Sequence, residues 1–323
     1  MQDDGEESHV PGLEDAFDAR RALVAGVGGG GDVVGALPTA MLLERHGVDV
    51  TLGGVAWERV PHDDRVGPRS MDEIRGLERL HEGIGLATGD TATEDGLVFT
   101  ESRVAEHLDE PVALLDVTAG AGGVAAAFEA FCEVRDVNLV VGVDAGGDAV
   151  AHGDEPGIES PIADGILVAA LDALDVPSML GVFGAGSDGE LTRAELDAAF
   201  QRIAEDGGLL GAWGLTPRTV EAMERLIAAV GTTEASKLPV EAASGAMGRR
   251  GIRDGERTVE MTPLSTATVY VDPATVAAQS RIVELVRDHG DVDAVHRALR
   301  DAGYRTEIEA ESARLDGGAG LQD

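Results

Sequence analysis

ALVAGVGGGGDVVGALPTAMLLERHGVDVTL, residues 22–52, decides the fold class. Ala22–Val27 is a run of small apolar residues that predicts a buried strand, and the chain then enters a run of glycines. Leu37–His46 carries apolar residues at helical spacing and ends at Gly47, a residue type that commonly follows a helix. Val48–Leu52 predicts a second strand. A strand, a glycine-rich turn, a helix and a strand in this order form a βαβ unit with parallel strands.

The same alternation continues along the chain. Further apolar runs predict four more strands, at Val112–Asp116, Leu139–Val143, Met179–Phe183 and Thr266–Val271. Helical patterns follow them, and Met71–Glu82 is also predicted as a helix, whereas Gly89–Thr100 is predicted as a polar hairpin. We therefore expect an α/β fold with a doubly wound, mostly parallel, Rossmann-like sheet of about six strands flanked by helices.

The pattern predicts one folded unit. Residues 20–275 form the expected Rossmann-like domain, the C-terminal helices of residues 276–323 pack on it before a frayed tail, and residues 1–19 form a flexible acidic N-terminus. The first residues are too acidic for a secretory signal, and no apolar run reaches the roughly 18 residues of a membrane span. We expect a cytoplasmic protein with no membrane partner.

The charge balance is extreme. The chain has 60 Asp and Glu residues against 25 Lys and Arg residues, a formal net charge of −35, and Lys237 is its single lysine. This composition resembles that of proteins from salt-accumulating halophilic archaea, in which concentrated salt screens the repulsion between acidic groups. A nucleic-acid partner is disfavoured because duplex binding needs a basic surface. The single cysteine, Cys132, excludes a disulfide framework and is interpreted as a buried small hydrophobe.

The glycine-rich turn predicts an anion site. Glycines let the backbone approach a ligand closely, and the start of the following helix offers free N–H groups. The expected ligand-binding residues of this turn are Gly28, Gly29, Gly30, Gly31, Asp32 and Gly35. The spacing Gly26-x-Gly28-x-x-Gly31 also fits a dinucleotide fingerprint, but Glu58, the first acid after the second strand, comes late for an NAD site. Asp32 would repel a pyrophosphate unless a cation bridged them.

Acids after other strands predict a metal site. Asp144 and Asp148 flank Gly146 and Gly147, and Asp188 follows the next strand. Because carboxylates are the ligands of Mg²⁺ or Mn²⁺, we expect these three acids to hold such an ion, with catalytic roles for Asp144 and Asp148. Asp116 and Thr118 are expected to join the site, with Thr118 contacting ligand. The alternative is a solvated acidic loop.

Basic residues are expected to neutralise this cluster. Lys237 is predicted as a third catalytic residue, because lysine is otherwise absent from the chain. Arg249, Arg250, Arg253 and Arg257 lie within nine residues and are predicted to form an anion clamp or lid, with Arg249 and Arg250 as its expected ligand-binding residues. His152 is a candidate general base or ligand. Trp213 is expected in the core or at a subunit contact, with stacking on a base as the alternative, so a homo-oligomer stays open.

Three segments carry a resemblance to known families. Gly28–Ala36, Gly142–Ala163 and Glu234–Pro263 resemble a family of uncharacterised, mainly archaeal proteins labelled only as a domain of unknown function. More loosely, Gly31–Ala36 and Gly142–Asp148 look like motifs of D-glutamate cyclase-like domains, although the Pro and the Asn-Glu of those motifs are lacking. This likeness implies a metal-dependent site for a small acidic metabolite.

The expected function is a metal-assisted enzyme that acts on a small phosphate- or carboxylate-bearing metabolite. Two alternatives stay open, a non-catalytic nucleotide-binding regulatory module and an NAD(P)-dependent oxidoreductase. The expected partner is a small anionic metabolite or a nucleotide.

Overall fold

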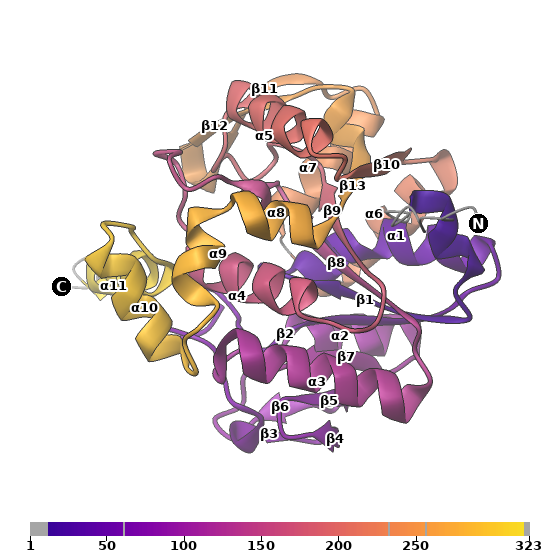
Figure 1. Ribbon diagram of the computed structural model, residues 1–323. Helices are drawn as coiled ribbons and strands as arrows, with labels where there is room; N and C mark the ends of the chain where they lie inside the picture. Colours follow the sequence, from indigo (N-terminus) through magenta and orange to yellow (C-terminus); the bar gives the residue numbers. More distant parts are fainter. Residues whose placement is uncertain (1–11, 61, 232, 256, 320–323) are drawn as a thin grey trace, which may run out of the picture.

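A mixed α/β architecture is seen in a computed structural model, which describes residues 12–60, 62–231, 233–255 and 257–319 (Figure 1). The central sheet has nine strands in the order β10-β13-β9-β8-β1-β2-β7-β5-β4. The strands are β1 Arg21–Gly26, β2 Asp49–Val55, β4 Glu78–His81, β5 Ile84–Ala87, β7 Val112–Leu115, β8 Leu139–Ala145, β9 Ser178–Phe183, β10 Leu209–Gly214 and β13 Ala267–Val271. The predicted α/β class is confirmed, but the sheet is larger than the expected six strands.

The opening βαβ unit is confirmed. Strand β1 pairs in parallel with β2, and α1 connects them. Helix α1 (Asp32–Arg45) begins directly after the glycine turn, five residues earlier than predicted. Gly47 follows the helix with a φ of 92°, which L side chains rarely adopt and which explains the glycine there.

The parallel strands of the sheet determine where a ligand can bind. From β1 the chain moves outward to β2 and β7, then returns to place β8 on the other side of β1, followed by β9. The direction of winding therefore reverses between β1 and β8. In open α/β sheets ligands bind outside the carboxyl ends of the two strands at such a switch point.

Both ends of the sheet differ from the prediction. Met71–Glu82 is not a helix, because a short 3₁₀ turn at Met71–Glu73 leads into β3 (Ile74–Arg75) and β4. Gly76, with a φ of 71°, makes the turn between these strands and interrupts the helical pattern. The predicted hairpin at Gly89–Thr100 is also wrong. Only β6 (Ala92–Thr93) forms there, paired with β3, while the actual hairpin joins β4 to β5.

The end of the sheet formed by β10 and β13 was predicted in part. Strand β13 forms as expected, but it is antiparallel to β9, and the unpredicted β10 pairs with it at the edge. Two further unpredicted strands, β11 (Gly248–Ile252) and β12 (Arg257–Met261), form a separate hairpin. Their sequence is rich in arginine and glycine and carries little of the apolar alternation by which strands are recognised.

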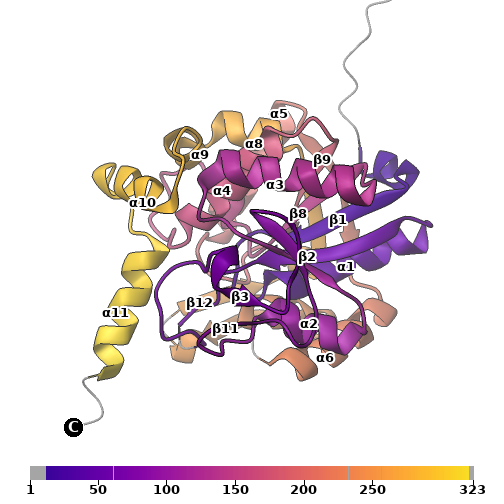
Figure 2. The ribbon, with the colours of Figure 1, turned by 90° about the horizontal axis from the view of Figure 1, so that it is seen from below.

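Helices cover both faces of the sheet. They are α1, α2 Thr100–Leu108, α3 Gly120–Arg135, α4 Pro161–Asp172, α5 Arg193–Glu205, α6 Pro217–Val230, α7 Glu234–Ala243, α8 Pro273–Gln279, α9 Arg281–Val286, α10 Val292–Asp301 and α11 Glu307–Ala319. Figure 2 shows α3, α4, α8 and α9 on one side of the sheet and α2 and α6 on the other, with α11 extending from the body. Each side has its own apolar core.

Both ends of the described chain contribute residues to the apolar cores. Leu13–Asp18, inside the expected acidic N-terminus, forms a 3₁₀ helix in which Leu13 and Ala16 are buried, whereas residues 1–11 lie outside the described residues. Helices α8, α9 and α10 share the core of α4. None of the helices in the described part of the chain is long and apolar enough to cross a membrane.

Candidate metal centre

A cavity of about 600 Å³ lies at the switch point, outside the ends of β1 and β8. Its lining is strongly acidic, with ten carboxylate side chains against three arginines, Arg59, Arg253 and Arg314. The carboxylates are Asp32, Asp144, Asp148, Glu159, Asp164, Asp188, Glu190, Glu234, Glu307 and Glu311. A cavity with this excess of negative charge attracts cations before it can accept an anion.

The glycine turn forms one wall of this cavity. The N–H of Gly28 donates to Oδ2 of Asp32 at 2.8 Å, and the N–H of Gly30 donates to the carbonyl of Trp57 at 2.9 Å. A Cβ on Gly28 would lie 2.4 Å from the same Asp32 oxygen, so glycine is needed for this approach. The amide of Gly28 therefore binds a carboxylate of its own chain.

The predicted residues of this turn are not all in the cavity. Gly28, Gly29, Gly30 and Asp32 line it. A side chain on Gly31 would meet Thr233, and one on Gly35 would meet Ala145, Phe183 and Ser236, so those two glycines serve close packing instead.

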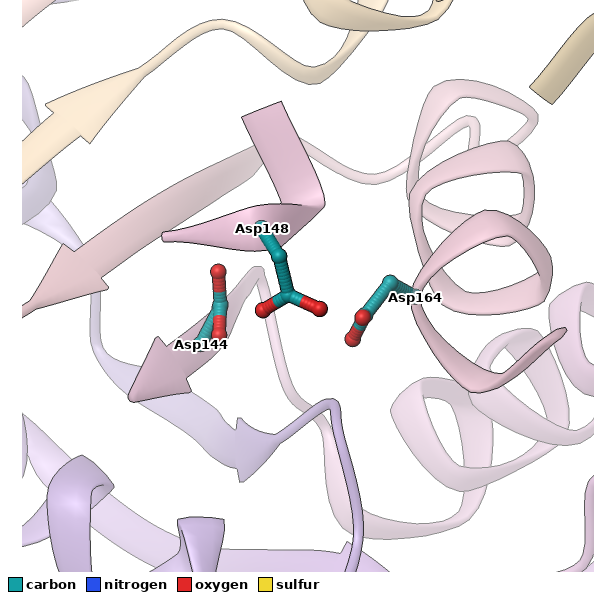
Figure 3. Close-up of side chains that lie close together, drawn as sticks. All are labelled: Asp144, Asp148 and Asp164. Carbon is teal, nitrogen blue, oxygen red and sulfur yellow. The ribbon is translucent and has the colours of Figure 1, made fainter. Parts of the chain in front are cut away.

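The acids that follow β8 converge as predicted. Asp144 is the penultimate residue of β8 and accepts a hydrogen bond from the N–H of Ala149 at 3.0 Å. Asp148 lies in a 3₁₀ turn and accepts one from Oγ of Ser160 at 2.6 Å. Asp164, in the first turn of α4, faces them. Figure 3 shows the carboxylate of Asp148 between those of Asp144 and Asp164.

The loop after β9 brings in two more acids. Asp188 and Glu190 lie beside Asp148, and Glu190 Oε2 accepts from the N–H groups of Glu159 and Ser160. Gly146 allows the two loops to meet, since a Cβ there would lie 2.3 Å from Cγ of Asp188. The predicted ligands Gly146 and Gly147 thus have positive φ values, 136° and 114°, but neither lines the cavity.

Two groups of three carboxylates have metal-ligand spacing. Asp144, Asp148 and Asp164 form one group, and Asp148, Asp188 and Glu190 form the other. Within each group one oxygen per residue lies within 4.8 Å of the others, and all five side chains are buried. Carboxylate oxygens at this spacing suit Mg²⁺ or Mn²⁺.

Burial makes this cluster costly without a cation. It raises the pKa of Asp144, Asp164 and Asp188 well above the usual range, and the charge of Asp148 raises each of them further. Burial likewise raises the pKa of Asp32 to about 7. At Oδ1 of Asp164 and at both oxygens of Asp188, no hydrogen bond of normal geometry is formed with the described residues. These oxygens are available to a ligand.

Sequence comparison places the chain in a family. The family described as "Protein of unknown function (DUF1152)" matches residues 23–315. The chain belongs to the DUF1152 family. Its matched region includes every residue that lines the cavity, from Gly28 to Arg314. No curated protein and no solved structure matches the chain.

The counter-charges of this DUF1152 protein differ from the expected ones. Lys237 pairs with Glu241 at 3.3 Å on an exposed face of α7 and does not line the cavity. Arg249 and Arg250, on β11, also lie outside it. Arg253, a member of the same predicted clamp, does line the cavity and pairs with Glu159 at 2.8 Å and Glu190 at 3.4 Å. The register of the unpredicted hairpin separates these arginines.

Arg59 supplies a second positive charge. It pairs with Glu311 at 3.2 Å, donates to the carbonyl of Gly28 and lies over the ring of the buried Trp57 at 4.4 Å. Nothing in its local sequence pattern marks it, since it follows β2 in an irregular segment. Glu58 is not available for a ribose, because it is buried and accepts from the N–H of Thr100 at the start of α2.

Helix α11, which the sequence pattern did not predict, adds two buried acids. Glu307 accepts from the N–H groups of Ile162 and Ala163 and so caps the start of α4. Glu311 accepts from Arg59 and from the N–H of Gly67. Burial raises the pKa of Glu307 to about 7. The C-terminal helix is thus part of the cavity wall.

Other expected residues have structural environments. Asp116 accepts from the N–H groups of Met71 and Thr118, two strands away from the switch point, so Thr118 does not reach the cavity. His152 pairs with Asp154 outside it. Trp213 is 37% exposed on edge strand β10 and not in the core, while Cys132 is buried as predicted.

Proposed function

We propose that this chain is a metal-dependent enzyme that acts on a small metabolite bearing a phosphate or carboxylate group. The proposal rests on one observation: buried oxygens of Asp164 and Asp188, at the cavity, form no hydrogen bond of normal geometry with the described residues. Removing a carboxylate from water without such compensation is costly, and a bound cation offsets that cost. Oxygen-only ligands favour Mg²⁺ or Mn²⁺ over softer metals.

The charge of the cavity supports an ordered mode of binding. An anionic metabolite is repelled by the carboxylates until cations have bound, after which its oxygens can complete the coordination of the metal. Arg59 and Arg253, at the cavity wall, can then pair with the remaining charge of the metabolite. The metal would polarise the bound group or lower the pKa of a coordinated water.

Strand order supports a nucleotide as one candidate for this ligand. The parallel strands run β7-β2-β1-β8-β9, the order of dinucleotide-binding sheets, and the cavity lies at their switch point. This observation also favours the second candidate function, a regulatory module that binds a nucleotide through the same metal without turnover.

A two-step binding experiment tests the proposal. The protein is stripped with EDTA, held in molar KCl to screen its net charge, and titrated with MnCl₂ by calorimetry. The manganese-loaded protein is then screened by thermal shift against nucleotides, sugar phosphates and amino acids. We expect saturable Mn²⁺ binding and a phosphate- or carboxylate-bearing compound that stabilises the protein only with Mn²⁺ present. Turnover of that compound supports the enzyme, and its absence supports the regulatory module.

A pair of variants controls this experiment. Asp188→Asn should weaken Mn²⁺ binding, whereas Asp154→Asn should not, because Asp154 is exposed and pairs with Arg281 away from the cavity. Stabilisation of the stripped protein by a polyamine, with no Mn²⁺ binding, would overturn the metal site. Stabilisation by a nicotinamide dinucleotide without metal would favour the oxidoreductase instead.

A further inference from the structure

The two groups of acids share one residue, and that sharing bears on the number of ions. Asp148 belongs both to the group with Asp144 and Asp164 and to the group with Asp188 and Glu190. We infer that the cavity binds two divalent cations bridged by the carboxylate of Asp148, and that its ligand is a phosphate-bearing compound whose oxygens contact both ions. This inference rests on the proposed function and specifies its metal centre.

Each group has its own independent indication of a bound ion. In the first group Oδ1 of Asp164 is buried and forms no hydrogen bond of normal geometry with any described residue. In the second group the same holds for both oxygens of Asp188. The side chains come from residues that are only 4% and 8% exposed, and buried polar atoms of this kind normally have a partner. A single ion in one group would leave the other group's oxygens unsatisfied.

Asp148 is placed to act as the bridge. Its carboxylate lies between Asp144 and Asp164 in Figure 3, and one of its oxygens also accepts from Oγ of Ser160. The same Ser160 hydroxyl lies 3.1 Å from Oε2 of Glu190 in the second group. Asp148 therefore connects the two groups through one carboxylate, as bridging ligands do in two-metal sites, where the ions lie roughly 3.5–4 Å apart.

Charge compensation also favours two ions when the carboxylates are ionised. The two groups contain five carboxylates, and among the described residues Arg253 is paired with one of them, Glu190, at 3.4 Å, and also with Glu159 at 2.8 Å. Two divalent cations supply four positive charges, and Arg253 supplies at most one more. One divalent cation would leave two buried negative charges uncompensated, which is strongly disfavoured in a desolvated site.

A phosphate-bearing ligand follows from such a pair of ions. Two cations at this separation are bridged readily by two oxygens of one phosphate group, and two-metal sites of this kind are common in enzymes of phosphoryl transfer. A carboxylate also has two oxygens, but it carries a lower charge and compensates the metal pair less well. The inference therefore selects phosphate from the two classes that the proposed function allows.

The stoichiometry of Mn²⁺ binding tests this inference. EDTA-stripped protein in molar KCl is titrated with MnCl₂, and free Mn²⁺ is measured by electron paramagnetic resonance. We expect two bound ions per chain, with spin–spin coupling between them in the bound spectrum. Inorganic phosphate should change that spectrum more than acetate does. Uncoupled ions, or a spectrum that responds equally to acetate and phosphate, would contradict the inference.

Variants assign the two ions. Asp164→Asn and Glu190→Gln should each retain one ion, and Asp148→Asn should retain neither. Asp154→Asn is the control, since Asp154 is exposed, pairs with Arg281 and does not line the cavity, and it should keep two. One ion in the wild-type chain would overturn the bridged pair and leave the proposed function standing, whereas no bound ion would overturn both. The wild-type count does not depend on the folding of any variant.

Discussion

The turn after β1 and the loops after β8 and β9 lie at the same edge of the sheet, but their polar groups are used differently. In the turn, the N–H of Gly28 binds Asp32 and the N–H of Gly30 binds Trp57. In α4 and in the loop after β9, one oxygen of Asp164 and both oxygens of Asp188 form no hydrogen bond of normal geometry with residues that the structure describes. The hydrogen-bonding groups of the glycine turn are thus satisfied by the chain itself, whereas those of the acids are not.

This comparison explains the acidity of the cavity. Asp32 occupies the position at the start of α1 where an external anion would otherwise bind the glycine turn. The turn thus contributes a further carboxylate and not an empty anion site. In the proposed function, an anion would therefore be held mainly by the metal and by arginine.

The largest expected effect is on metal binding, and it comes from a substitution in the loops after β8 and β9. Asp148→Asn removes the carboxylate shared by both groups, so the stabilisation of the protein by Mn²⁺ should disappear. At a free Mn²⁺ concentration of 100 Kd this is a loss of about 2.7 kcal/mol for each of the two ions. Thermal unfolding with and without MnCl₂ measures it. Asp197→Asn, at an exposed position of α5, is the control, and an unchanged shift in the Asp148 variant would contradict the role of the loops.

A substitution in the glycine turn should change the stability of the protein and not its binding of metal. Gly28→Ala forces a Cβ against Asp32, and overpacking of this kind costs about 1–3 kcal/mol in the free energy of unfolding. Gly122→Ala is the matched control, because Gly122 lies in α3 with open space around it, and alanine there should stabilise the helix by up to about 1 kcal/mol. Urea unfolding compares them. If the two substitutions changed the free energy of unfolding equally, the contact between Gly28 and Asp32 would not depend on glycine.

The raised pKa of Asp32 predicts a pH dependence of the metal-free protein. The folded state holds the proton up to a pKa of about 7, whereas the unfolded state loses it near the ordinary value of about 4. The contribution of Asp32 to stability therefore falls as pH rises between these values and levels off above 7. Glu307, with a pKa also raised to about 7, acts in the same direction.

Denaturation of stripped protein across this pH range checks that sign. Asp32→Asn should unfold like the wild type near pH 4 and be the more stable protein above pH 7, because its amide can still accept from Gly28. With Mn²⁺ the trend should reverse, since metal binding requires deprotonated carboxylates. A variant that is less stable than the wild type at high pH would show that the burial of Asp32 is not costly.

The smallest changes in stability are expected from substitutions of the basic residues, and they should differ between Arg253 and Lys237. Arg253→Ala breaks half-buried pairs with Glu159 and Glu190 and should cost about 1 kcal/mol of unfolding free energy, discounted for solvent screening. Lys237→Ala removes one exposed pair with Glu241 and should change that free energy by less than about 0.5 kcal/mol. It should leave Mn²⁺ binding unchanged. Loss of metal binding in the Lys237 variant would restore the catalytic role expected from its rarity.

The sequence predicted the β1–α1–β2 unit, strand β8 with Asp144 and strand β9, which Asp188 follows, because apolar runs and glycines directly encode them. It did not predict Asp164, although one acid in a helix buried almost all round is itself a signal of a buried charge. Glu307 and Glu311 were missed because α11 is acidic and has little apolar periodicity, so only tertiary packing reveals its buried face.

The basic residues were misplaced for a related reason. Residues 249–253 lie within one segment, and their separation into exposed and cavity-lining arginines depends on the pairing of β11 with β12. Lys237 was selected because it is the single lysine, but the rarity of a residue type does not show which way its side chain points. Whether a residue follows a strand at the switch point was the better guide to its place in the cavity.

Anomalous diffraction from crystals grown with MnCl₂ would locate the ions. We expect manganese peaks beside Asp148, one facing Asp144 and Asp164 and the other facing Asp188 and Glu190, with metal–oxygen distances of roughly 2.1 Å. Peaks confined to exposed acids, with none among these five carboxylates, would contradict the proposed metal centre.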